Sequence, residues 1–264
     1  MNSNLPVVLA FAGHDPSGGA GIQADIETLA SHGCHAATVV TALTVQDTRD
    51  VSGFTPVEAI HIITQARAIL EDMPVAAIKL GMLGSVENAE VIHTILADYP
   101  EIPVVFDPVL AAGSGSSLVE YGLTEAIRSL LLPETRILTP NSLEARELAP
   151  EADTLGACAL ALLDQGVDYV LVTGSHEQSP DVINRLYHDQ HQLDSFSWER
   201  LPYSYHGSGC TLAAAIAAQL ALGREPVAAI RAAQAFTWQA LRRGYRPGLG
   251  QHLPNRCPSP RNTD

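Results

Sequence analysis

The chain has 264 residues, 46% of them hydrophobic, and carries a formal net charge of −14. This length and apolar content fit one large α/β domain that needs no metal or disulfide to stabilise its core. The acidic balance repels nucleic acids and anionic membrane surfaces, so we expect neither as a partner.

Short apolar runs alternate with helical patterns along the chain. The expected strands are Val7–Ala12, Ala37–Leu43, Val75–Leu80, Val104–Phe106, Arg136–Thr139 and Tyr169–Thr173. Helical patterns are expected at 22–29, 55–70, 86–97, 123–131, 153–164, 208–222 and 226–243. Because strands separated by helices pair in parallel, this order predicts an α/β fold of the doubly wound type, with a mostly parallel central sheet flanked by helices.

Three local patterns refine this outline. The run Thr55–Glu58 combines a cap residue, a proline and a glutamate, and predicts that a helix begins there. Val182–His188 and Asp194–Leu201 predict an antiparallel hairpin at the sheet edge. The helix over Ser208–Leu222 is apolar on every face and is therefore expected to be buried.

The chain contains no internal linker, repeat or low-complexity segment, so we expect a single domain over residues 1–250. Gln251–Asp264 is rich in Pro, Asn and Arg and is expected to be a loose C-terminal tail. Met1–Pro6 lacks the basic start of a signal peptide, and no apolar run is long enough to span a bilayer. The four cysteines form no CxxC pair and no zinc-ligand spacing: Cys34, Cys158, Cys210 and Cys257. These features favour the reducing cytoplasm.

Unusual polar and glycine-rich loops follow the expected strands. They are Asp15–Gly21, Thr44–Asp47, Gly81–Leu83, Asp107–Ser117 and Asn141–Glu144. In doubly wound sheets, ligands bind beyond the carboxyl ends of the strands. The loops are therefore expected to converge on one site.

The run His206–Thr211, with the letters H-G-S-G-C-T, leads into the expected buried helix. Glycines allow close approach to a ligand, and a helix N-terminus offers unpaired N–H groups to an anion. The run therefore suits charge that develops on a transferring phosphoryl group. The alternative is a glycine-rich helix start used only for packing. The run is not a Walker loop, because no GK[ST] follows it.

Two runs carry a resemblance to a known family. The letters G-S-G-C-T at Gly207–Thr211 resemble the Gly-Thr-Gly-Cys-Thr turn of the hydroxymethylpyrimidine/phosphomethylpyrimidine kinases of thiamine biosynthesis, a branch of the ribokinase-like superfamily. The run from Gly13 to Asp25 is similar to a long motif of the same kinases. The resemblance extends from Leu5 to about Gly250, with the motifs in the family's order. It implies an ATP-dependent, Mg²⁺-requiring kinase that acts as a cytoplasmic homodimer on a small pyrimidine.

The resemblance also implies catalytic roles. Cys210 stands where other ribokinase-like enzymes carry an aspartate base, and the N–H groups of Gly207, Ser208 and Gly209 are expected to hold the transferring phosphoryl group. A thiol at a helix N-terminus has its thiolate favoured, which is expected to lower the pKa of Cys210. The alternative is a small buried apolar side chain.

The pyrimidine-binding residues are inferred by resemblance alone. They are Gly13, Asp25, Thr44, Gln46, Met82 and Val109. The amide of Gln46 offers both a donor and an acceptor, which matches an aminopyrimidine edge. The alternatives are a solvated helix face for Asp25, a loop position facing water for Gln46 and core packing for Met82.

The nucleotide and metal residues are also inferred from the family pattern. The expected nucleotide contacts are Asp107, Asn141, Thr173, Gly174, Gly207 and Gly209. Asp107 and Glu144 are expected to hold Mg²⁺ and its waters, because Mg²⁺ prefers oxygen ligands. The alternative for Asn141 and Glu144 is a helix cap and its first turn, and both roles can hold together.

Some positions depart from the family pattern. Many members carry lysine in the loop that here reads Ala111–Gly115 and at the position of Thr173, and Tyr203–Tyr205 also differs. Lys79 is the sole lysine. The charge of a triphosphate must then be met by Mg²⁺, backbone N–H groups and arginine.

Three alternative functions stay open. A pyridoxal kinase on the same scaffold would bind a similar ring with a hydroxymethyl arm. A non-catalytic pyrimidine-binding regulator is suggested by the missing lysines, although the complete G-S-G-C turn argues against it. A nicotinamide oxidoreductase is remote, because the first loop lacks GxGxxG.

Overall fold

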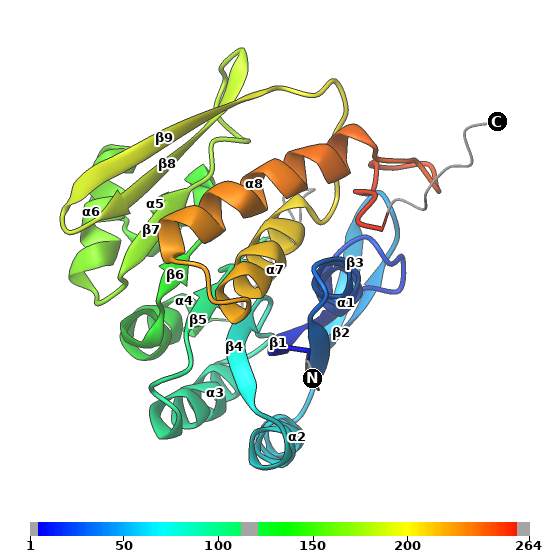
Figure 1. The fold of residues 1–264 in the computed structure, drawn as a ribbon, viewed down its shortest axis with the longest axis vertical. Helices are drawn as coiled ribbons and strands as arrows, with labels where there is room; N and C mark the ends of the chain where they lie inside the picture. Colours follow the sequence, from blue (N-terminus) through cyan, green and yellow to red (C-terminus); the bar gives the residue numbers. More distant parts are fainter. Residues whose placement is uncertain (1–4, 112–120, 258–264) are drawn as a thin grey trace.

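A computed structural model describes residues 5–111 and 121–257. Over these residues the chain forms one nine-stranded sheet in the order β3-β2-β1-β4-β5-β6-β7-β8-β9 (Figure 1). The strands are β1 (Val7–His14), β2 (His35–Gln46), β3 (Val51–Pro56), β4 (Val75–Leu80), β5 (Val104–Phe106), β6 (Ile137–Leu138), β7 (Tyr169–Val172), β8 (Asp181–His188) and β9 (His191–Glu199). The central strands β2, β1, β4, β5, β6 and β7 pair in parallel, whereas β3, β8 and β9 pair antiparallel at the two edges. The expected doubly wound architecture and its edge hairpin are confirmed.

Helices cover both faces of the sheet (Figure 1). They are α1 (Gly21–Ser31), α2 (Ala59–Asp72), α3 (Val86–Asp98), α4 (Leu123–Ala126), α5 (Ser142–Leu148), α6 (Leu155–Asp164), α7 (Ser208–Ala221) and α8 (Pro226–Arg242). Alternate strand residues face opposite layers: Phe11 packs with α2 to α6, and Val8 packs with α1, α7 and α8. This alternation follows from the two-residue period of a strand and explains why the strands are apolar on both faces.

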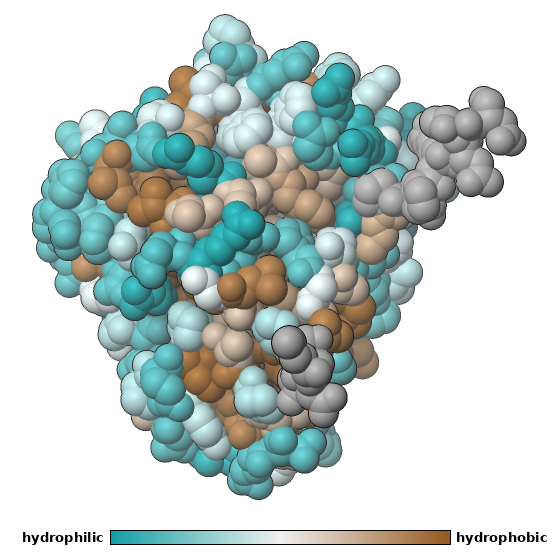
Figure 2. Space-filling view, in the orientation of Figure 1, coloured by the Kyte–Doolittle hydropathy of each residue, from teal (hydrophilic) through white to brown (hydrophobic). Residues whose placement is uncertain are grey.

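Helix α7 lies in the core, as its uniform apolarity predicts. Every residue from Thr211 to Gln219 is buried. Alanines let α7 approach the sheet closely, and its first turn, Ser208–Thr211, is thereby fixed at the sheet's ligand-binding edge. Figure 2 shows that hydrophilic residues dominate the visible surface, with apolar residues in separate patches. Across the described residues, no helix has the length and apolar character needed to cross a bilayer.

The predicted helix start at Thr55 is wrong. Thr55 and Pro56 belong to β3, where they pair with Leu43 and Ala42 of β2, and α2 begins only at Ala59. The cap and proline signals are local, whereas the pairing with β2 satisfies the backbone of this segment through tertiary contacts. The helix predicted over Leu123–Leu131 is also modified, because α4 continues as a π-helical turn over Ile127–Leu131.

The segment expected to be loose from Gln251 onward is packed over residues 251–257. Leu253 and Arg256 are 2% and 1% exposed, respectively. His252 bridges to Tyr205, and Leu253 bridges to Tyr245, so backbone pairing fixes the segment. The structure corrects the expectation here because a polar composition does not prevent a segment from pairing with other strands. Residues 258–264 lie outside the described part of the chain.

Candidate active site

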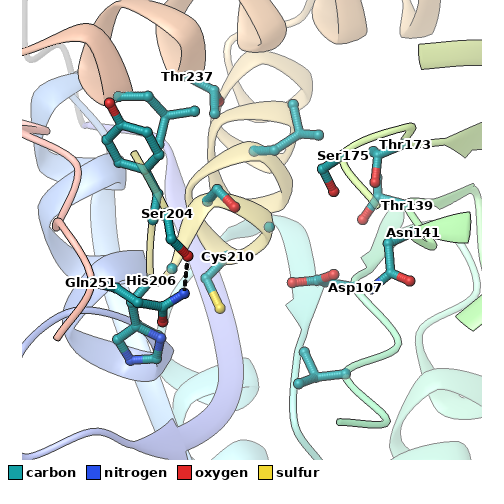
Figure 3. Close-up of a pocket in the computed structure, with 18 of the residues that line it drawn as sticks. Asp107, Thr139, Asn141, Thr173, Ser175, Ser204, His206, Cys210, Thr237 and Gln251 are labelled. Atoms are coloured by element: carbon teal, nitrogen blue, oxygen red, sulfur yellow. Dashed lines mark hydrogen bonds between the residues drawn. The ribbon is translucent and has the colours of Figure 1, made fainter. Parts of the chain in front are cut away.

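A cavity of about 630 Å³ opens at the carboxyl ends of the parallel strands. Figure 3 shows two walls: Asp107, Thr139, Asn141, Thr173 and Ser175 face His206, Gln251 and Ser204, with the thiol of Cys210 between them. Most of the residues inferred from the family line this cavity: Gly13, Thr44, Gln46, Met82, Asp107, Val109, Asn141, Glu144, Thr173, Gly207, Ser208, Gly209 and Cys210. The convergence expected from the sequence is therefore observed. Asp25 and Gly174 do not line it, and of the expected loop Ala111–Gly115 only Ala111 is described.

The glycine-rich turn before α7 approaches another loop very closely. Gly207 has φ +82°, and a Cβ there would lie 1.9 Å from the carbonyl oxygen of Gly19. A Cβ on Gly209 would lie 3.2 Å from Oδ2 of Asp107. The turn thus needs glycine at Gly207 for both its conformation and its contact. It presents the N-terminus of a 14-residue helix to the cavity, with first-turn N–H groups that lack helical partners.

The thiol of Cys210 lies inside the cavity. Burial raises its pKa to about 12; Lys79 opposes this, while Asp107 and Asp25 add to it. The lowered pKa expected from the helix N-terminus is therefore wrong for this structure, because desolvation and two nearby carboxylates outweigh the helix dipole. Cys210 is a thiol at neutral pH in this state.

Asp25 and Lys79 form an ion pair beneath the cavity. Lys79 Nζ lies 2.9 Å from Asp25 Oδ2, and both side chains are 0% exposed. Burial alone would lower the pKa of Lys79, but the charges of Asp25 and Asp107 raise it, so the lysine stays cationic. Asp25 therefore serves as the counter-ion of Lys79. The direct ring contact inferred for Asp25 does not fit its position.

Asp15 and His206 connect the two glycine-rich loops, and sequence reasoning missed both. Asp15 accepts hydrogen bonds from the N–H groups of Gly19 (3.0 Å) and Ala20 (2.8 Å), and His206 Nε2 lies 2.9 Å from Asp15 Oδ2. Burial would raise the pKa of Asp15, but the hydrogen bonds from His206 and Ser17 lower it. The letters D-P-S-G are typical of a side-chain-capped turn and could have indicated this role.

Asp107 and Glu144 supply buried carboxylates on the opposite wall. Burial raises the pKa of Asp107 to about 6, and burial together with Asp107 raises that of Glu144 to about 8. Two acids that lose charge when buried would regain it beside a cation. Within the described residues no cluster of three or more acidic, His or Cys side chains could hold a metal alone. Mg²⁺ commonly takes one or two carboxylates plus phosphate oxygens, so the donor set fits it.

Asn141 and Glu144 form a capping box on α5. Asn141 Oδ1 accepts from the N–H groups of Leu143 (2.9 Å) and Glu144 (3.0 Å). Glu144 Oε2 accepts from the N–H of Asn141 at 2.8 Å. The helix-cap alternative is thus confirmed. Both side chains also line the cavity, so the cap does not exclude a ligand role.

Gln234 presents an unpartnered donor at the other end of the cavity. Its Oε1 accepts from Asn184 Nδ2 at 2.8 Å and from Trp198 Nε1 at 3.2 Å. These two donors fix the orientation of the amide, and its Nε2 has no partner among the described residues although Gln234 is only 3% exposed. A buried donor without a partner is costly, so a ligand acceptor is expected there. A purine ring with its ring nitrogens fits this requirement.

Gly174 packs behind the cavity wall. Its N–H donates to Asn184 Oδ1 at 3.1 Å. A Cβ at Gly174 would lie 2.2 Å from the carbonyl oxygen of Ile183. The glycine is therefore required for β8 to pass close to the end of β7. Gly174 itself does not line the cavity, whereas Asn184, which accepts its N–H, does.

Comparison with known proteins places the chain among kinases. A sequence model of the phosphomethylpyrimidine kinase family matches residues 15–255. A hydroxymethylpyrimidine/phosphomethylpyrimidine kinase of Synechococcus elongatus is 37% identical over 252 residues, which cover 94% of this chain and 95% of that protein. A bifunctional thiamine biosynthesis protein of Geobacter sulfurreducens is 36% identical over 92% of this chain and 50% of its own length.

Solved structures agree in fold. The pyridoxal kinase of Staphylococcus aureus in complex with AMP-PCP and pyridoxal aligns with a TM-score of 0.83 at 30% identity, over 96% of this chain and 94% of that one. A phosphomethylpyrimidine kinase from Clostridium difficile aligns with a TM-score of 0.78 at 30% identity, over 90% of this chain and 100% of that one.

Proposed function

The chain belongs to the phosphomethylpyrimidine kinase family, and from this we propose that it transfers a phosphoryl group from ATP to hydroxymethylpyrimidine and to its monophosphate in thiamine biosynthesis. The observation that carries this proposal is the position of Cys210. It lines the same cavity as the apolar Met82, the amide of Gln46 and the polar side chains of Asn141 and Gln234. A ring with a hydroxymethyl arm and a nucleotide could therefore meet at the same helix N-terminus.

The proposed ring site has an apolar floor and a polar edge. Met82 and Ala42 are buried together, with Val109, Phe54 and Val51 packed against them. Gln46 lines the same end and would pair its amide with an aminopyrimidine edge.

The phosphoryl group would be held by the N–H groups of Gly207, Ser208 and Gly209 at the start of α7. Phosphoryl transfer depends mainly on positioning and on stabilising charge, so these N–H groups would provide most of the effect. Cys210 would accept the hydroxyl proton of the substrate. Lys79 favours its thiolate, and a cation beside Asp107 would neutralise one of the charges that oppose it.

Mg²⁺ and ATP complete the proposal. Asp107 and Glu144 would hold the cation and its waters, whose role is to neutralise charge on the phosphate oxygens. Asn141 and Thr173 line the adjoining part of the cavity. Gln234 Nε2 would donate to a ring nitrogen of the purine. Because no lysine lines the cavity among the described residues, the cation and the backbone N–H groups would carry most of the triphosphate charge.

We further propose that the protein acts in the cytoplasm as a homodimer, as the family resemblance implies. Leu43 and Val45 on β2 are 54% and 67% exposed, and large exposed apolar side chains often mark contacts with another protein. Sedimentation at the mass of the single 28.1 kDa chain would contradict the dimer.

A pyridoxal kinase is the second candidate, because solved pyridoxal kinases align with this chain over 96% of its length. The test is Mg²⁺-dependent ATP turnover with hydroxymethylpyrimidine, its monophosphate and pyridoxal as acceptors, with products identified by mass. Turnover of the two pyrimidines at higher kcat/KM than pyridoxal is the expected result. Preference for pyridoxal would favour the second candidate, and ring binding without ATP consumption would indicate a regulator.

A further inference from the structure

Arg256 is the largest side chain that the fold buries completely among the described residues, at 1% exposure. A buried guanidinium is costly unless all its donors are engaged. Nε donates to Thr211 Oγ1 at 2.8 Å, Nη1 donates to Glu27 Oε2 at 3.0 Å, and Nη2 donates to the carbonyl oxygen of Gly19. The guanidinium is thus held by three different segments of the chain.

Two of these partners belong to the glycine-rich loops of the site. Gly19 lies in the loop after β1, and Thr211 lies in the first turn of α7, where its Oγ1 donates to the carbonyl oxygen of Gly207 at 2.7 Å. Arg256 therefore joins the loop after β1 to the turn that would hold the phosphoryl group. Asp15 and His206 join the same two loops at a second point.

The segment that carries Arg256 also follows the cavity wall. The N–H of Gln251 donates to the carbonyl oxygen of Thr48 at 2.7 Å, beyond the end of β2. The N–H of His206 donates to the carbonyl oxygen of His252 at 2.9 Å. Gln251 Nε2 donates to Ser204 Oγ at 2.6 Å, as the dashed line in Figure 3 shows. Residues 250–256 thus run from the ring end of the cavity to the start of α7.

We propose that Arg256 is a positioning residue for phosphoryl transfer. It does not line the cavity. It acts through Thr211 and Gly19, and it fixes the turn Gly207–Cys210 at the spacing that a phosphate chain requires. Sites that hold a reacting group need supporting hydrogen bonds, because small displacements of the binding groups are costly. This inference rests on the proposed binding of ATP at that turn.

The test compares a ligand that has phosphates with one that has none. Trp198 and Trp238 line the cavity, so their fluorescence can report the binding of AMP-PCP with Mg²⁺ and, separately, of adenosine. For Arg256→Ala we expect AMP-PCP affinity to fall by about tenfold or more while adenosine affinity stays within about twofold, because only the phosphate-holding turn is displaced. A general loss of folding would weaken both ligands together.

Kinetics and chemical rescue supply the second readout. Arg256→Ala should lower kcat by about tenfold to a hundredfold, with a much smaller change in KM for the pyrimidine. Added guanidinium chloride at low, non-denaturing concentration should restore part of kcat, whereas ammonium chloride at equal ionic strength should not. Glu27→Gln, which removes only the half-exposed ion-pair partner, should keep kcat close to that of the unaltered protein.

Two further variants keep the test decisive if Arg256→Ala does not fold. Arg256→Lys keeps the charge but cannot reach all three partners, and Thr211→Val removes the hydroxyl that links Arg256 to Gly207. Both should show the same selective loss for AMP-PCP. Equal losses for AMP-PCP and adenosine, or unchanged affinity for both, would overturn the inference. If none of the three acceptors is turned over, the proposed function fails, and the comparison of the two ligands still decides the role of Arg256.

Discussion

Several opposing effects act on the pKa of the Cys210 thiol. The start of α7 and the cation of Lys79 favour a thiolate, whereas desolvation and the carboxylates of Asp107 and Asp25 favour the thiol. In this structure desolvation and the two carboxylates are stronger, so the thiol form is favoured. Entry of a cation and a phosphate chain would change this balance, so we expect the reactivity of Cys210 to depend on the bound state.

Replacement of Cys210 by alanine should lower kcat by about a hundredfold, the usual size of the loss when a proton acceptor is removed. Cys210→Ser should lose less, since a hydroxyl keeps a polar atom at that position. Turnover with the pyrimidine is the measurement, and substrate binding by calorimetry shows that the cavity is intact. Cys257→Ala, which alters an exposed cysteine, is the matched control. Full turnover by Cys210→Ala would contradict the proton-acceptor role.

Gln234 gives a second test at the scale of one side chain. Gln234→Glu keeps an oxygen for Asn184 and Trp198 and, at a pH where its carboxyl group is ionised, replaces the free donor with another acceptor. We expect KM for ATP to rise by about tenfold or more, since removal of a buried hydrogen-bond partner costs about 1–3 kcal/mol. The KM for the pyrimidine should stay nearly constant. A rise in both values, or in neither, would mean that Gln234 does not contact the nucleotide.

At the scale of elements, segments that carry their own signals are predicted well. β5 is a continuous apolar run, β1 is one up to Ala12, and β4 is apolar apart from Lys79. Together with the uniform apolarity of α7, these runs allow burial to be inferred from composition. Asn141 and Glu144 carry the complete signature of a capping box, and this signature predicts the cap of α5. β3 escapes prediction because its residues contain a cap signal, and only the pairing with β2 reveals a strand.

The loop after β1 and the turn before α7 approach each other closely, and this contact leads to a prediction about the stability of the fold. Gly207→Ala should destabilise the protein by about 3–5 kcal/mol, because it combines a strained backbone with a clash against the carbonyl oxygen of Gly19. Gly223→Ala is the matched control, since it also has positive φ but nothing lies within 4 Å of its Cβ. It should cost only about 1–2 kcal/mol from backbone strain. Urea denaturation measures both, and equal losses would contradict the clash.

At the scale of the whole molecule, the site is assembled from segments that lie far apart in the sequence. Lys79 is 54 positions from Asp25, His206 is 191 from Asp15, and Arg256 is 237 from Gly19. Local patterns cannot report such contacts, so most residues inferred from the sequence do line the cavity, but the ion pair and the two links between loops were not predicted. The assignment of Asp25 to the ring fails for the same reason, because its motif gives no information about Lys79.

The two buried carboxylates make the stability of the whole molecule depend on pH. The pKa values of Asp107 and Glu144 are raised to about 6 and about 8 in the folded protein, above the ordinary values of 3.8 and 4.5. Between the ordinary and raised values the folded state binds more protons than the unfolded state. Stability should therefore fall as pH rises from about 4 to about 8, and the full penalty should be present above pH 8.

If Asp107 and Glu144 hold Mg²⁺ as proposed, the ion should remove this penalty, because it would bind the charged form of both acids and compete with protons. We expect the Mg²⁺-induced rise in Tm to be largest above about pH 8 and to become small below about pH 6, as follows from the two raised pKa values. Differential scanning calorimetry across this range, with and without Mg²⁺, measures the effect.

Glu144→Gln keeps the capping box while it removes one titrating group, so its Tm should depend less on both pH and Mg²⁺. Glu71→Gln alters an exposed acid on α2 and should behave like the unaltered protein. A Mg²⁺ effect that is equal at every pH would show that Asp107 and Glu144 do not hold the cation.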